Sequence, residues 1–171
     1  MRPAILFWLG LGVCLGAPVL LIAEKEHLLA TGRVVLLPLA PVDPRSLMQG
    51  DYMVLRYAVA RPLQEALRAA TPATDDDGFE GPRTGSFILT LDADGVGTFA
   101  RLDDGETPPG PNETRLRFKR ARFEPAFGAE AFFFEEGRGE YYEAAKYGEL
   151  RVDASGRVLL SGLRDADRNP L

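Results

Sequence analysis

The sequence predicts a mainly β domain of the α+β class, attached to a single N-terminal transmembrane helix. Three observations support this prediction: an uncharged apolar run opens the chain, short segments of alternating side chains follow, and turn-forming residues separate those segments. The 171 residues include 18 glycines and 13 prolines, a content that favours many turns and short strands over a helical bundle. We therefore expect a small antiparallel β barrel or sandwich with two short helices.

The apolar run covers residues 4–23 and contains no charged side chain. A helix of this length spans about 30 Å, the thickness of the hydrocarbon core of a bilayer. No A-x-A pattern precedes Glu24, which argues against a cleaved signal peptide, and Val13 before Cys14 argues against a lipoprotein signal. We expect an uncleaved anchor with its junction over residues 1–27 and a soluble β-rich domain over residues 28–171.

Charge sets the expected orientation and excludes some partners. Arg2 and the amino terminus precede the apolar run, and the positive-inside rule places such a basic end in the cytoplasm. The domain is then expected on the periplasmic side of a bacterial inner membrane. The formal net charge of −5 gives no electrostatic basis for nucleic acid as a partner. Cys14 is the only cysteine, so an internal disulfide and a multi-thiolate metal site are excluded.

Strand predictions begin directly after the anchor. Residues 33–39 form a β-branched apolar run that ends before prolines. Gly50 and Asp51 then turn the chain into residues 52–59, along which successive side chains point to opposite faces. The face expected in the core carries four apolar or aromatic side chains: Met53, Leu55, Tyr57 and Val59.

The remaining predicted elements alternate with turn-rich loops. Residues 61–70 place leucine and alanine at helical spacing and predict a short amphipathic helix. Hairpins are expected over residues 86–102 and 147–163, because alternating strands flank turns that contain aspartate and glycine. The other predicted elements are strands at residues 114–123 and 131–136 and about two helical turns at residues 139–146.

Two motifs support a family resemblance. VDPRSLMQGDYMVLRY (residues 42–57) contains the pattern G-D-Y-x-x-L-x-Y, and FFFEEGRGEYYEAAKYGELRV covers residues 132–152. Together with the apolar N-terminus, they resemble the bacterial family named for its GDYxxLxY signature. The resemblance implies a membrane-anchored protein without an assigned activity, often encoded beside polytopic membrane proteins. It implies no catalytic residue, and we expect neither a cofactor nor a metal.

The signature turn and a block of glutamates and tyrosines near the end of the chain are the candidate functional surface. This glutamate–tyrosine block comprises Glu135, Glu136, Glu140, Glu143 and Glu149 with Tyr141, Tyr142 and Tyr147. In a structural interpretation Asp51 caps the turn and Arg45 pairs with it. In a functional interpretation these residues border a pocket or a docking face. Within the second motif, Glu140, Glu143 and Tyr147 share one face of the predicted helix. The candidate binding residues are Arg45, Asp51, Tyr52, Glu136, Glu140, Glu143 and Tyr147.

The cationic segment at residues 114–123 is a further candidate for binding. Its charges can face nucleic acid, anionic lipid or acidic segments of the chain itself. The 25 acidic residues of the chain favour an internal or inter-subunit counter-surface. The cations are Arg115, Arg117, Lys119, Arg120 and Arg122.

The expected function is that of an accessory or interaction subunit that docks on a polytopic inner-membrane protein. A membrane-anchored hydrolase is the alternative, with either paired carboxylates or Ser46 as the reacting group. Ser46 precedes the Gly-Asp turn in the way that the nucleophile does in type I signal peptidases. That mechanism needs a neutral lysine as its base, and the remaining candidate, Lys119, lies in a row of arginines.

Overall fold

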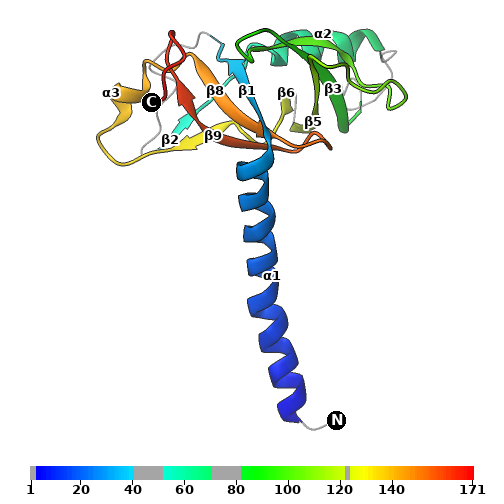
Figure 1. The fold of residues 1–171 in the computed structure, drawn as a ribbon, viewed down its shortest axis with the longest axis vertical. Helices are drawn as coiled ribbons and strands as arrows, with labels where there is room; N and C mark the ends of the chain where they lie inside the picture. Colours follow the sequence, from blue (N-terminus) through cyan, green and yellow to red (C-terminus); the bar gives the residue numbers. More distant parts are fainter. Residues whose placement is uncertain (1–2, 41–51, 71–81, 122–123) are drawn as a thin grey trace.

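The computed structural model describes residues 3–40, 52–70, 82–121 and 124–171. One long helix, α1 (Pro3–Thr31), projects from one side of a β-rich domain (Figure 1). An 18-residue window within Phe7–Thr31 has a mean hydropathy of 1.9, and by length and composition this helix suffices to cross a membrane. The expected helix of membrane-spanning length is therefore confirmed.

The strands of the domain form three open sheets, and all paired strands are antiparallel. The first sheet has the order β1 (Arg33–Pro38), β8 (Tyr147–Val152) and β9 (Val158–Arg164). The second has the order β4 (Gly97–Leu102), β3 (Thr84–Leu91), β5 (Glu113–Ala121) and β6 (Glu124–Ala126). The third is a two-stranded ribbon of β2 (Tyr52–Val54) and β7 (Ala131–Phe133). No closed barrel forms among the described strands, so a sandwich-like arrangement describes the domain.

A single hydrophobic core joins the sheets to helix α2 (Ala60–Ala70). The helix buries Leu63 and Leu67 fully, and each such leucine contributes about 1.5–3 kcal/mol through burial. Phe87 of β3 is fully buried and lies within 6.3 Å, centroid to centroid, of the rings of Phe118 and Phe127. Figure 1 shows α2 on the opposite side of the domain from α1.

The segment after the signature turn has the burial pattern that its alternation predicts. Met53, Leu55, Tyr57 and Val59 are at most 4% exposed. Only the first three residues of this segment pair as a strand. Beyond them, Arg56 and Ala58 form backbone hydrogen bonds with residues 38–40 of the β1 end. The alternation persists because the chain remains extended against the core.

The two hairpins, the strand at β5 and the helix at α2 are confirmed, whereas the predicted helix at residues 139–146 is too long. α3 covers only Gly139–Tyr142. The backbone N–H of Lys146 already donates to the Arg164 carbonyl, at 2.8 Å, and its own carbonyl accepts from Leu39, at 2.8 Å. Strand pairing therefore replaces the second helical turn. The predicted strand at residues 131–136 also ends early, at Phe133.

Candidate functional site

Two residues of the signature, Leu55 and Tyr57, belong to the core of the domain. The Tyr57 hydroxyl donates to the carbonyl of Ala129 at 2.6 Å, and the ring is only 3% exposed. Burial, assisted by the negative charge of Glu130, raises the pKa of Tyr57 far above its ordinary value. A phenol that is buried in this way and bonded to the backbone has a structural role.

Tyr52 lies at the start of β2, where it is half-buried. It is directly opposite Phe133 of β7, and the two rings are 5.6 Å apart between centroids. Arg45, Ser46 and Asp51 lie outside the described residues, so the structure does not test the predicted Arg45–Asp51 pair or the serine alternative.

The residues of the glutamate–tyrosine block separate in the structure. Glu136, Glu140 and Glu143 are exposed around α3, while Tyr147 is half-buried at the start of β8. The prediction that Tyr147 shares a helical face with Glu140 and Glu143 is wrong, because the helix ends at Tyr142. These three glutamates and Tyr52 remain the described candidates for a docking surface.

Glu149, which the sequence groups with these glutamates, turns into the domain instead. Its carboxylate accepts from the guanidinium of Arg164 at 2.5 Å and from the Ser161 hydroxyl at 3.0 Å. The strand pairing of β8 with β9 brings these side chains together. Glu149 is therefore part of the packing between two strands, and sequence spacing alone gives no sign of this.

The surface around β7 and α3 combines exposed carboxylates with an exposed aromatic side chain; we call it the acidic edge. Phe133 is 74% exposed, and Arg138 lies over the Tyr141 ring at 5.1 Å from its centroid. Four exposed carboxylates flank these rings, and none of them forms an ion pair with a cation in the described part of the chain. The four are Glu135, Glu136, Glu140 and Glu143.

No described group of three or more histidine, cysteine or acidic residues has a geometry that could hold a metal ion. Catalysis by paired carboxylates needs environments that separate their pKa values. The glutamates of the acidic edge are all open to solvent, whereas a carboxylic acid that serves as a general acid is usually held in an apolar pocket. The acidic edge therefore presents exposed carboxylates in the same segment as an exposed aromatic ring.

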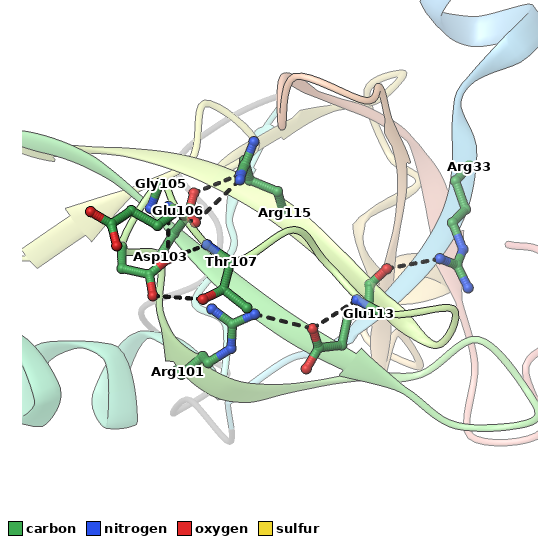
Figure 2. Close-up of polar contacts among 10 residues, drawn as sticks. Arg33, Arg101, Asp103, Gly105, Glu106, Thr107, Glu113 and Arg115 are labelled. Carbon is green, nitrogen blue, oxygen red and sulfur yellow. Dashed lines mark hydrogen bonds and ion pairs between the residues drawn. The ribbon is translucent and has the colours of Figure 1, made fainter.

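The cationic strand divides its charges between its two faces. Arg115, Arg117 and Lys119 point outward, whereas Arg120 is 8% exposed on the inner face. Arg115 pairs with Asp103 at 2.6 Å, as Figure 2 shows. This ion pair supports the expectation of an internal acidic counter-surface for that residue. Lys119 is exposed, which does not suit a lysine that must lose its proton. Arg122 lies outside the described residues.

A further feature, the junction between α1 and the domain, is not evident from the sequence. Leu28 of the helix is only 5% exposed, and Glu24 forms an ion pair with Arg157 at the start of the β9 side of the last hairpin. The Arg151 guanidinium reaches the Gly32 carbonyl at 3.5 Å. A Cβ atom at Gly32 would lie 2.5 Å from the Leu28 carbonyl oxygen, so the close approach requires glycine. These contacts fix the last turns of the helix to the domain.

Comparison with known proteins identifies the family of this chain through one match to a family model. Neither the curated proteins nor the solved structures contain a match to this chain. The family model described as GDYXXLXY protein matches residues 14–163, a range that includes the second half of α1 and nearly all of the β-rich domain. This protein therefore belongs to the GDYXXLXY family.

Proposed function

We propose that this protein is a membrane-anchored interaction subunit that docks on a polytopic membrane protein. The observation that supports this function best is the acidic edge, where an exposed phenylalanine lies in the same segment as four exposed carboxylates, none of which forms an ion pair within the described part of the chain. An aromatic centre with a polar rim is the usual composition of a protein–protein contact.

The position of this surface relative to the anchor also supports docking. Figure 1 shows β7 and α3 in the part of the domain that extends sideways from the top of α1. A partner that spans the same membrane presents its extramembrane surface at a similar height. The complementary surface is expected to be apolar at its centre, with basic groups that meet the glutamates.

The anchor supports a further part of the proposal. α1 is assigned as a single membrane span, with the domain on the periplasmic side of a bacterial inner membrane. The basic N-terminus supports this orientation through the positive-inside rule. Ala69→Cys places a thiol on the exposed end of α2, far from the anchor. A membrane-impermeant maleimide should label this variant in intact spheroplasts. Labelling only after lysis would show that the domain lies on the cytoplasmic side instead.

The central experiment is a mild-detergent pull-down of the tagged full-length chain. We expect one polytopic membrane protein to co-purify with the parent and to be reduced with Glu140→Ala and with a Glu140→Ala/Glu143→Ala pair. Glu106→Ala is the matched control, since Glu106 is an exposed carboxylate in the loop between β4 and β5. Asp51→Ala tests the signature turn in the same assay.

The circular dichroism spectrum and melting temperature of each variant must match those of the parent. Recovery of no multi-span protein, under conditions that retain known membrane complexes, would contradict the docking function. Screening for hydrolase activity is then the next experiment.

A further inference from the structure

A large cavity lies at the junction where α1 enters the domain. Its volume is about 810 Å³, and three separate parts of the chain enclose it: the end of α1, the loop and strand around residues 109–115, and the turn around residues 152–157. The polar residues that matter below are Glu24, His27, Arg33, Glu113 and Arg157. The proposed docking surface does not include this cavity.

Arg33 differs from the other arginines of this cavity in the kind of partner that it contacts. Its guanidinium donates to the backbone carbonyls of Glu113 at 3.0 Å and Pro111 at 3.4 Å, and Figure 2 shows the first of these contacts. Both acceptors are neutral, and none of the ion pairs among the described residues involves Arg33. Its side chain is also exposed. Arg33 thus faces the cavity without a direct ion-pair partner in the described part of the chain.

The other arginines that line the cavity already have carboxylate partners. Arg115 pairs with Asp103 at 2.6 Å, and Arg157 contacts both Asp153 and Glu24. The Glu113 carboxylate accepts from the Arg101 guanidinium at 3.3 Å. An anionic group that enters this cavity therefore finds its electrostatic partner in Arg33.

The height of the cavity above the membrane identifies the source of such an anion. The uncharged run ends at Ala23, and Glu24, His27 and Leu28 follow within the next five residues of the same helix. At about 1.5 Å per residue, these lie up to about 7.5 Å beyond the hydrocarbon core. The headgroup layer of one leaflet is about 5–7.5 Å thick, since the whole bilayer is about 40–45 Å and its core about 30 Å. The helical wall of the cavity therefore overlaps the headgroup layer.

We infer that this junction cavity binds the phosphate-bearing headgroup of a phospholipid, with Arg33 as the residue that contacts the phosphate. Arginine offers a planar set of donors that suits phosphate, and three of its five N–H groups remain after the two carbonyl bonds. Leu28 and Val152 line the same cavity and provide apolar contact for the glycerol and upper acyl region.

Such a lipid would fill the space between the anchor and the domain and fix the domain at a defined height. The inference rests on the membrane anchoring in the proposed function but not on the docking partner. Retention of the parent protein in salt-washed membranes tests the anchoring by itself. Lipid binding and partner binding are then measured separately, so failure of one leaves the other intact.

The experiment is native mass spectrometry of the full-length chain in mild detergent, titrated with palmitoyl-oleoyl phosphatidylethanolamine. Diacylglycerol with the same acyl chains is the matched ligand, because it lacks only the phosphate-bearing headgroup. We expect the phospholipid to bind one to one and diacylglycerol to bind much more weakly. Equal binding of both would show that the lipid contacts only the apolar helix, and would overturn the inference.

Variants test the role of Arg33 and separate it from a structural role. Arg33→Gln keeps donors for the two carbonyls but loses the charge, and should weaken phospholipid binding at least tenfold, or about 1.4 kcal/mol. Arg33→Lys should retain most of the binding. Arg61→Gln removes an exposed cation on α2, away from the anchor, and should have no effect.

Glu24→Gln, unlike Arg33→Gln, is not expected to weaken phospholipid binding. It breaks the ion pair with Arg157, but it also removes a negative charge from the cavity. Binding should be unchanged or tighter. Weaker binding to Glu24→Gln and Arg33→Gln alike would show that these residues only hold the junction together. Displacement of the lipid by inorganic phosphate would show an anion site that needs no lipid. Either result would overturn the inference, as would unchanged binding to Arg33→Gln.

Discussion

The ring of Tyr57 lies directly against the backbone of Gly148. A Cβ atom placed at Gly148 would be 2.9 Å from Cε1 of Tyr57 and 3.0 Å from its hydroxyl oxygen. Tyr57 is the last residue of the signature, and Gly148 belongs to the YGELRV segment near the end of the chain. The two motifs that support the family resemblance thus meet in the core, and this contact explains why a tyrosine and a glycine are required together.

Gly148→Ala is expected to destabilise the domain by about 1–3 kcal/mol, because the added methyl group overpacks a rigid aromatic contact. Gly162→Ala is the matched control, since Gly162 lies on the adjacent strand β9 and a Cβ atom added there would meet no heavy atom within 4 Å. Urea unfolding of both variants measures the difference. Equal effects of the two substitutions would show that the Tyr57 contact is not tight.

Tyr57→Phe removes the hydroxyl that donates to the Ala129 carbonyl and leaves that acceptor buried. We expect a loss of about 1–3 kcal/mol at neutral pH. Tyr141→Phe, at an exposed position, should change stability by less than about 0.5 kcal/mol. Thermal unfolding followed by circular dichroism distinguishes the two variants.

The same tyrosine predicts a loss of stability at high pH. Burial raises the pKa of Tyr57 in the folded state above the value of about 10 for an unfolded chain. The folded state therefore binds the proton more tightly, and its advantage is complete below pH 10 and decreases as the pH rises above it. The parent should show a steeper alkaline loss of stability than Tyr57→Phe. Identical alkaline profiles would mean that the Tyr57 ring is open to solvent.

Local patterns predicted most of the strands because their causes are local. The alternation at residues 52–59 follows from the period of an extended chain, and the β3–β4 turn follows from Asp92, whose carboxylate accepts from Asp94 and Val96 at 2.9 Å. The short α3 was not predictable in this way. Its end depends on the pairing of Lys146 with Arg164, residues that only the folded sheet brings together.

The sequence predicted only the part of the candidate surface that depends on local patterns. Exposed glutamates follow from a polar segment, but the inward turn of Glu149 depends on Arg164 in a neighbouring strand. The junction cavity joins residues 24–33 to residues 109–115 and 152–157, and no spacing along the chain indicates that these segments meet. Long-range contacts of this kind leave no periodic signal in one sequence.

The turn between β8 and β9 is expected to lose stability at acidic pH. The Asp153 carboxylate is partly buried, which tends to raise its pKa, but hydrogen bonds from Ser155 and Arg157 outweigh that effect and lower it. Its Oδ1 accepts from the Ser155 N–H at 2.8 Å and the Arg157 N–H at 2.9 Å. A lowered pKa in the folded state stabilises the fold above the ordinary carboxyl value of about 4, and this stability is lost as the pH falls through the lowered value.

Asp153→Asn should therefore cost about 1 kcal/mol at pH 7 and much less at a pH below the lowered pKa of Asp153, where the parent carboxyl group is protonated. Asp167→Asn is the control, because the Asp167 side chain is exposed and forms no described hydrogen bond or ion pair. Unfolding free energies measured across this pH range give the comparison. A cost for Asp153→Asn that does not change with pH would exclude a role for the charge.

Two adjacent phenylalanines of β7 are expected to respond in opposite ways to truncation. Phe132 packs against the core and against Tyr142, with the ring centroids 5.0 Å apart, whereas Phe133 is 74% exposed. Phe132→Ala should lower the free energy of unfolding by about 3 kcal/mol, and Phe133→Ala by no more than about 1 kcal/mol from the lost stacking on Tyr52. In the pull-down, Phe133→Ala should reduce partner recovery at nearly full stability. If a folded Phe133→Ala variant retains the partner fully, Phe133 is not part of the docking surface. The carboxylates alone would then have to account for binding.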